Sequence, residues 1–325
     1  MYARGPSLTV LLLFLPLFLA ATATPASPQS SPHIALRIGV LIPSAASATR
    51  QSRSVLAGLR LGASEARQTA ALFGDDAIFY EAEAADERSA LVAAEKLLSR
   101  RQVQVLVSTS LALTDALSRF AESHRIIFLN VASRRSDVRE ACRRYTFHVE
   151  ASSEMYDAAP KLIRTSAKSP PTSPADRRDS VVLWSAQLEK FGAAQLNDRY
   201  RDRFRVGMDG GAWAGWMAAK VVAEAALRAR SVSAARLVTY MEARSTRFDG
   251  HKGWPLSFRL EDHQLRQPLY IVVPPANDRA SAQVHDVPEL GSLSSGDADD
   301  QAGNRLLDQL SPAATSHQCN WERRN

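Results

Sequence analysis

A run of three hydroxyl side chains, Ser108-Thr109-Ser110, directly follows the apolar segment 103–107. Hydroxyl and backbone N–H groups in such a turn can hydrogen-bond a carboxylate or another small polar group. The apolar segment predicts a buried strand, and the apolar spacing within 111–124 predicts a helix after the turn. Small ligands bind at the carboxyl ends of strands in open α/β sheets, so the pattern predicts a ligand turn. A role limited to capping the helix is the open alternative.

No other group of residues in the sequence has the spacing of a catalytic or metal site. A Gly-x-Ser-x-Gly turn, a Ser-x-x-Lys motif and a pair of carboxylates placed for acid–base work are all missing. The acidic residues Glu81, Glu83 and Asp86 are explained by a solvated helix start, and the histidines are scattered. We therefore expect no catalytic residue, no metal ligand and no cofactor.

Three tryptophans, Trp213, Trp216 and Trp254, could line a cleft, but their helical spacing or their place beside a strand favours the core. The pairs Asp249-Gly250 and Lys252-Gly253 are typical of turns rather than of a phosphate loop.

The hydroxyl turn is expected to belong to an alternating series of strands and helices. Strands alternating with helices at this spacing predict an α/β fold with a doubly wound parallel sheet. Right-handed crossovers then place the strand ends, including 131–133 after the fourth strand, on one edge of the sheet. The expected strands are 34–43, 77–82, 103–108, 125–130 and 145–149, and the expected helices are 54–72, 86–100 and 111–124.

Beyond residue 149 the pattern becomes mostly helical. The segment 166–180 is rich in Ser, Pro and Arg and predicts a linker, and 181–184 is a short apolar run of ambiguous type. A terminal strand pair is expected at 255–260 and 268–273, before a tail, 274–325, that is expected to be mobile except near Cys319. The expected helices are 155–164, 188–204, 213–230 and 234–243.

The first 23 residues have the layout of a secretory signal peptide, with Arg4, an apolar run over 8–20 and small residues at 21–23. A membrane anchor is the weaker alternative, because the run is shorter than the roughly 20 residues that span a bilayer. Residues 24–33 then predict a disordered leader. We expect an exported protein that is not embedded in the membrane after cleavage.

The two cysteines, Cys142 and Cys319, are expected to form a disulfide in an oxidising compartment, which would tie the tail to the first domain. One buried and one exposed thiol is the alternative. The net charge of +6 comes from scattered basic pairs rather than from a basic stripe, so nucleic acid is not an expected partner.

Segments along the chain also occur in a recognisable order, beginning with Arg37-Ile-Gly-Val-Leu-Ile-Pro43, the 108–110 turn and Phe128-Leu-Asn-Val-Ala-Ser133. This order resembles the type 1 periplasmic binding proteins, in particular the branched-chain amino acid type that supply ABC transporters. The resemblance is strongest to a branch associated with PQQ-dependent (quinoprotein) alcohol dehydrogenase systems. The segments that carry it are 191–200, 213–219, 248–258 and 264–269, and Cys142 and Cys319 fall where that branch has cysteines.

The resemblance implies a ligand-binding first lobe over 34–150 and a second lobe over 151–273. Family members have a full α/β second lobe where this chain has only 166–184, so a reduced, mostly helical second lobe is expected. Tyr156, Trp184 and Glu189 are the candidates it offers for an α-amino group. In the first lobe the resemblance implies ligand contacts from Ser108, Thr109, Ser110, Ala132 and Ser133.

Our main hypothesis is a periplasmic solute-binding protein that captures a small polar organic solute by hinge closure and presents it to an ABC transporter permease. The second is an interaction protein that docks on a periplasmic dehydrogenase of a quinoprotein alcohol dehydrogenase system. An α/β hydrolase is the third, and the lack of a catalytic constellation disfavours it.

Overall fold

The computed structural model describes residues 33–166, 181–273 and 283–287, together with residues 304, 307–310, 319 and 321. The predicted signal peptide (1–23), residues 24–32 of the predicted leader, residues 167–180 of the predicted linker and most of the predicted tail lie outside these described residues. Within the described part, no helix combines the length and the apolar composition that crossing a bilayer requires.

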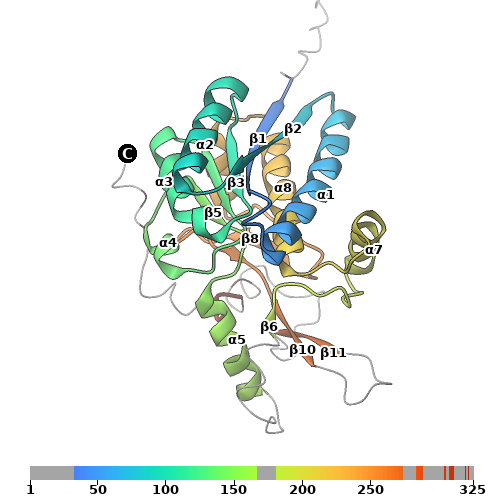
Figure 1. The fold of residues 1–325 in the computed structure, drawn as a ribbon. Helices are drawn as coiled ribbons and strands as arrows, with labels where there is room; N and C mark the ends of the chain where they lie inside the picture. Colours follow the sequence, from blue (N-terminus) through green and yellow to red (C-terminus); the bar gives the residue numbers. More distant parts are fainter. Residues whose placement is uncertain are drawn as a thin grey trace, which may run out of the picture. The chain divides into compact units, whose positions relative to one another are not determined.

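A five-stranded parallel sheet lies at the centre of this part (Figure 1). Its order is β2-β1-β3-β4-β5, so the winding direction reverses between β1 and β3. The pairing register aligns Leu41, Ser108, Asn130 and His148 across β1, β3, β4 and β5. The strands are β1 (Ala35–Pro43), β2 (Asp76–Ala84), β3 (Val105–Ser108), β4 (Ile127–Asn130) and β5 (Thr146–His148). The predicted doubly wound parallel sheet is confirmed.

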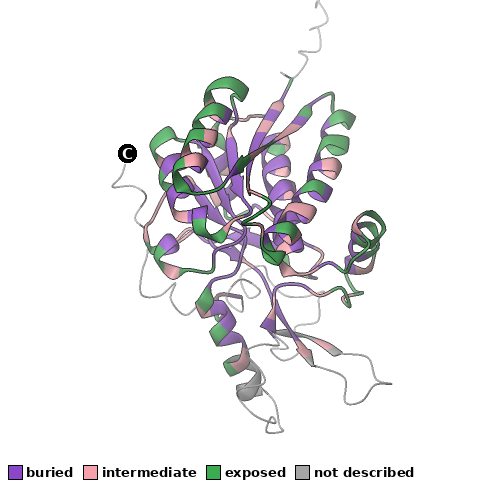
Figure 2. Ribbon diagram, viewed as in Figure 1, coloured by how far each residue is buried: buried purple, intermediate pink, exposed green. Residues whose placement is uncertain are grey.

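Helices cover both faces of the sheet, and the strands send alternate side chains into two apolar cores. Val105 and Val107 of β3 enter the core that contains α1 and α8, whereas Leu106 between them enters the core of α2 and α3. Figure 2 shows buried strands between helices whose outer faces are exposed. These helices are α1 (Arg50–Leu72), α2 (Glu87–Arg101), α3 (Thr114–His124, after a 3-10 turn at Leu111–Leu113) and α8 (Gly210–Ala229).

The predicted N-cap of α2 is present: the Asp86 carboxylate accepts a hydrogen bond from the backbone N–H of Ser89 at 2.8 Å. Helix α1 begins four residues earlier than predicted, because Thr49 and Ser52 form a capping box there. The short helix α4 (Ser136–Glu140) was not predicted, since five residues are too few to show a helical period.

Helix α8 packs directly on α1, although the prediction placed it in a second lobe over 151–273. Glycines make this close crossing possible: a Cβ on Gly58 would lie 1.8 Å from the carbonyl oxygen of Ala212, and one on Gly215 would lie 2.2 Å from that of Val55. The chain after the predicted boundary therefore returns to cover the central sheet.

Two small three-stranded sheets contain the later strands, and they correct the predicted pairing of 255–260 with 268–273. In the structure β8 pairs with β7 and β9, whereas β10 pairs with β6 and β11. The chain between them is held against β5, because the amides of Gln264 and Gln267 donate to the carbonyls of His148 and Val149 at 3.2 and 2.7 Å. The remaining elements are α5 (Ser153–Ser166), β6 (Val181–Val182), α7 (Ala193–Phe204), α9 (Ala234–Glu242), β7 (Phe248–Asp249), β8 (Pro255–Phe258), β9 (Leu265–Arg266), β10 (Leu269–Val273) and β11 (Gln283–Val287).

Cys142 and Cys319 form the disulfide that the sequence predicts, across a sequence separation of 177 residues. Two further contacts hold the chain end in place. The Cys319 N–H donates to the Glu261 carbonyl at 2.9 Å, and the Trp321 ring stacks on the buried His263 ring at a centroid distance of 4.4 Å.

Candidate functional site

The carboxyl edge of the central sheet brings together the two predicted ligand loops, 108–110 and 131–133. Ser108 and Asn130 end neighbouring strands at the same level, so the loops that follow them start side by side. The topological reversal lies next to them, between β1 and β3, where doubly wound sheets open a crevice. The structure thus supplies the edge on which the predicted site depends.

In the first loop, Ser108 and Thr109 have different roles. The Ser108 hydroxyl is used inside its own turn, where it accepts from the Ser110 N–H at 3.1 Å, and it does not cap the following helix. The Thr109 N–H donates to the Leu41 carbonyl at 3.1 Å and continues the pairing with β1. The Thr109 hydroxyl oxygen is buried and has no hydrogen-bond partner among the described residues. Ser110 is half-buried, and its side chain does not cap the following turn.

The second loop is shaped by Asn130, a residue the sequence analysis did not single out. Its carboxamide oxygen accepts from the N–H groups of Ser133 and Ala132 at 2.8 and 3.3 Å, and its nitrogen donates to the Ser133 carbonyl at 2.8 Å. The backbone donors of Ala132 and Ser133 are thereby occupied. The Ala132 carbonyl accepts from the Gln51 side chain at 3.2 Å, which joins this loop to the first turn of α1. The position of Asn130 at the end of an apolar strand was the available signal.

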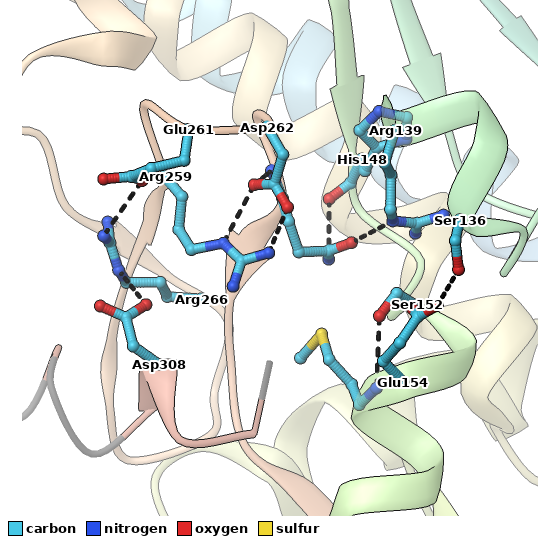
Figure 3. A network of polar contacts seen from close by, with 12 residues as sticks. Ser136, Arg139, His148, Ser152, Glu154, Arg259, Glu261, Asp262, Arg266 and Asp308 are labelled. Carbon is cyan, nitrogen blue, oxygen red and sulfur yellow. Dashed lines mark hydrogen bonds and ion pairs between the residues drawn. The ribbon is translucent and has the colours of Figure 1, made fainter. Parts of the chain in front are cut away.

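A buried arginine, Arg139 of α4, supports the second loop from behind (Figure 3). It donates to the carbonyls of Ser133 and Glu150 at 3.2 and 2.7 Å and to the Gln264 side chain at 2.7 Å. Burial lowers the pKa of Arg139 to about 10, so the guanidinium stays charged at neutral pH. Burial and nearby Arg139 lower the pKa of His148 well below its ordinary value, and its neutral ring accepts from Asn130 at 3.0 Å.

Tyr156, on α5, lies near the second loop, where it contacts Glu150 and Arg134. Its hydroxyl donates to the Glu150 carboxylate at 2.8 Å, and the Arg134 guanidinium lies 3.8 Å from the centre of its ring. Arg134 also approaches the same carboxylate at 3.4 Å. Burial, followed by the charge of Glu150, raises the pKa of Tyr156 well above its ordinary value, so the phenol keeps its proton. The sequence analysis missed Glu150, whose signal was an acidic residue between apolar Val149 and Ala151.

Trp184 and Glu189 are placed differently from the other predicted site residues. Trp184 is buried, donates its indole N–H to Asn197 at 2.9 Å and stacks on Trp213 at 6.0 Å, so its polar group and its ring are engaged in the core. Glu189 is exposed. The described contacts bring neither residue to the 108–110 turn.

The free energy of unfolding of the native protein is expected to fall as pH rises, and the Glu150→Gln variant is expected not to show this fall. Burial raises the pKa of Glu150 above its ordinary value of 4.5, although Arg134 and Tyr156 oppose this shift. The folded state keeps the proton to a higher pH than the unfolded chain, so stability falls as pH rises from 4.5 through the folded pKa. Urea unfolding of both proteins between about pH 4 and pH 8 measures the difference. Parallel curves, or the same change from the exposed Glu83→Gln control, would contradict the expectation.

Comparison with known proteins agrees with this fold. Residues 35–173 match the family model described as periplasmic binding protein. No curated protein matches the chain in sequence.

Solved structures of ABC transporter binding proteins resemble the chain over most of its length. A branched-chain amino acid ABC transporter periplasmic ligand-binding protein from Burkholderia xenovorans has 10% identity and a TM-score of 0.64, over 87% of this chain and 99% of that chain. The binding protein LivJ from Streptococcus pneumoniae, in complex with isoleucine, has 11% identity and a TM-score of 0.58, over 78% and 99%. A solute-binding protein from Rhodopseudomonas palustris, in complex with 3,4-dihydroxybenzoic acid, has 11% identity and a TM-score of 0.60, over 78% and 98%. Because the identities are only 10 to 11%, these similarities establish the fold alone: the chain has the fold of the type 1 periplasmic binding proteins.

Proposed function

We propose that this chain is an exported solute-binding protein that captures a small polar organic solute at the carboxyl edge of β1, β3 and β4 and presents it to an ABC-type permease. The solute carries a carboxylate. This group accepts hydrogen bonds from the hydroxyls of Thr109 and Ser110 and lies at the first turn of α1. Capture involves binding and closure, with no covalent step.

The observation that carries this proposal is the buried hydroxyl of Thr109, which has no hydrogen-bond partner within the described part of the chain. Leaving a buried hydroxyl without a hydrogen bond costs about 1 to 3 kcal/mol, so such groups are uncommon in folded proteins. This one lies in the first turn after β3, next to the reversal of the sheet order. A ligand oxygen at this place would provide the missing partner.

The start of α1 adds a second favourable feature. Gln51, in its first turn, touches the Ala132 loop, so the amino end of a 23-residue helix lies at the same edge as the two loops. The unpaired N–H groups and the dipole of a helix start favour an anion. The ligands named for two similar structures, isoleucine and 3,4-dihydroxybenzoic acid, both carry a carboxylate, which supports this choice of solute class.

Closure would occur about two chain segments that leave the sheet edge, 149–152 and 267–268. They lead to α5 and to the small sheet of β6, β10 and β11, which lie beyond the carboxyl ends of the central strands in Figure 1. Gln267 donates to the Val149 carbonyl at 2.7 Å and joins the two segments. Movement there would bring the small sheet toward the ligand loops, beside which Tyr156 already lies. We assign Trp184 and Glu189 no part in this site.

Export is supported by the signal-like pattern of 1–23 and by the disulfide between Cys142 and Cys319, because such bonds persist mainly in oxidising compartments.

Carboxylate solutes are expected to raise the melting temperature of the purified protein. For the solute that does so, Thr109→Val is expected to raise the dissociation constant about tenfold. A ligand that binds only the native state stabilises it, and one hydrogen bond to a charged group contributes about 1.5 to 3 kcal/mol. Melting temperatures are measured with isoleucine, leucine, benzoate and 3,4-dihydroxybenzoate, and the dissociation constant of the effective solute is then determined for each variant.

The matched control is Thr239→Val on α9, where the exposed threonine hydroxyl bonds only to the Ala235 carbonyl, at 3.0 Å. This variant should bind as the native protein does. The proposal fails if no carboxylate raises the melting temperature, or if the two variants bind equally well.

A further inference from the structure

A cavity of 1120 Å³ lies away from the carboxyl edge, between α1, α8 and the β7–β8 connection. Its described lining includes none of the residues of the two ligand loops. Gln51 contacts the Ala132 loop, whereas the part of α1 that lines the cavity begins at Gly62, eleven residues further on. At 1.5 Å per residue, Gln51 and Gly62 are roughly 16 Å apart along α1. The cavity is therefore separate from the proposed solute site.

The base of this cavity is formed by small residues where α1 and α8 cross, and their short side chains leave the space open. Gly62 and Ala66 come from α1 and Ala223 from α8. A Cβ on Gly62 would lie 2.7 Å from the Trp216 carbonyl, so the helices are in backbone contact and the base is rigid.

Aromatic rings form the wall, and their orientation is fixed. Trp216 donates its indole N–H to Glu65 at 2.7 Å, and the His251 ring stacks on it at a centroid distance of 5.4 Å. Phe191 also lines the cavity and is 53% exposed, so its ring is accessible to a ligand. Trp254 and Phe248 complete the aromatic lining.

Two sequence segments that contain these rings interlock through residues with left-handed backbone angles. Phe191, Gly192, His251 and Gly253 have φ values of 57°, 84°, 57° and 73°. A Cβ on Gly253 would lie 2.5 Å from the Phe191 ring, and one on Gly192 would lie 2.7 Å from His251. Of these four residues Phe191 and His251 are strained, because side chains disfavour positive φ, and strained backbone that the surrounding packing holds in place is concentrated at binding sites.

The charges on the lining favour an anion. The lining contains five basic and three acidic side chains, and two of the basic ones are paired: Arg199 with Glu65 at 2.8 Å, and Arg230 with Asp75, which lies outside the lining, at 2.5 Å. Lys220 and Arg228 share the single carboxylate of Glu224, at 3.4 and 3.0 Å. This sharing leaves excess positive charge at the mouth of an aromatic cavity.

We infer that this cavity is a second binding site, for a small organic anion with a flat apolar body such as an aromatic carboxylate or sulfonate. Its volume is slightly above the range of about 300 to 1,000 Å³ that is usual for ligand cavities, so it has room for a ligand of this class, and its lining combines apolar surface with a few placed polar groups. The flat body lies against Phe191 and the half-buried Trp254, and the anionic group lies beside Lys220 and Arg228.

The test is calorimetric titration of the purified protein with 1-naphthalenesulfonate and with its uncharged relative 1-naphthalenemethanol. The sulfonate is expected to bind saturably at one site and more tightly than the alcohol. The double variant Lys220→Gln, Arg228→Gln should lower the affinity for the sulfonate about tenfold or more and leave the affinity for the alcohol unchanged. Both side chains are partly exposed, 31% and 66%, so the fold should tolerate the change. The matched control, Arg88→Gln with Lys96→Gln on α2, removes the same charge at the same spacing of eight residues, also from exposed positions of a helix.

A second variant tests the cavity itself without altering its charge. Thr69 is an exposed residue of the lining, so Thr69→Trp should fill part of the cavity and lower the affinity for both probes. Gln68 is its neighbour and lies outside the lining, so Gln68→Trp should leave both affinities unchanged. Thr109→Val should also leave both probes unaffected, which separates this site from the solute edge. The inference is overturned if the sulfonate does not bind saturably, if the alcohol binds as tightly, or if the paired variants behave like their controls.

Discussion

Replacing Arg139 with alanine is expected to lower the free energy of unfolding by about 3 to 5 kcal/mol. The side chain is 5% exposed and donates to the carbonyls of Ser133, Arg135 and Glu150 and to Gln264. The variant leaves these acceptors without their donor, and each buried group left unsatisfied costs about 1 to 3 kcal/mol. Water entering the vacated space should offset part of this sum. Urea unfolding monitored by tryptophan fluorescence measures the change.

The matched control is Arg135→Ala, four residues earlier at the start of the same helix. Arg135 is exposed and pairs with Asp137, and exposed pairs contribute about 0 to 1 kcal/mol. A loss below about 1 kcal/mol for Arg139→Ala, or equal losses for the two variants, would show that the buried network does not hold the ends of β4 and β5 together.

The central sheet could be predicted from the sequence because its cause is local. Strands β1 to β4 are runs rich in apolar residues, helices α1, α2 and α3 have a helical apolar period, and Asp86 marks a helix start. In β3 the alternation of Val105, Leu106 and Val107 between two cores follows from the geometry of a strand alone. Elements of this kind need no knowledge of distant residues.

Pairing across long distances could not be predicted in the same way. The segments that became β8 and β10 lie close in sequence with turn residues between them, which favours a hairpin. Their separation depends on Gln264 and Gln267, whose partners lie more than 100 residues earlier, at separations of 116 and 118. No local pattern reveals such a bond.

Buried charges were missed for the same reason. Lys252 looks like part of a turn, yet its ammonium group donates to Gln267 and to the carbonyls of Leu183 and Pro268 at 2.9 to 3.0 Å, and it lies 3.8 Å from the centre of the Trp213 ring. A charged residue is usually solvated, so sequence reasoning assigns it to the surface unless its distant acceptors are known.

The candidate site was predictable in position and less so in detail. Strand order and loop composition indicated where the 108–110 and 131–133 loops meet. They could not show that Ser108 is used inside its turn, that Asn130 occupies the backbone donors of Ala132 and Ser133, or that Thr109 keeps a buried hydroxyl without a partner in the described part of the chain. Which of several adjacent hydroxyls remains available depends on hydrogen bonds that only the folded chain defines.

Removing the disulfide, by Cys142→Ser with Cys319→Ser, is expected to lower the free energy of unfolding by about 3 to 5 kcal/mol. The bond closes a loop across 177 residues, and in the chain-entropy model a long loop restricts the unfolded chain most. It also holds the segment that carries Trp321 on the ring of His263, whose Nε2 lies 3.0 Å from Glu242. Loss of the bond should therefore free the chain end as well as favour unfolding. Urea unfolding measures the first effect, and hydrogen exchange at the Cys319 N–H, which bonds to the Glu261 carbonyl, measures the second.

Two comparisons separate the covalent bond from the contacts around it. Trp321→Leu keeps the disulfide and removes the ring stacking together with the indole N–H hydrogen bond to the Leu260 carbonyl, so it should cost about 1 to 3 kcal/mol. A thiol reductant should destabilise the native protein about as much as the double substitution does, and it should leave the double variant unchanged. If Trp321→Leu costs as much as the double variant, the contacts of Trp321 rather than the bond are what fasten the chain end, and the entropic contribution of the long loop is small. If the reductant also destabilises the double variant, its effect does not come from this bond.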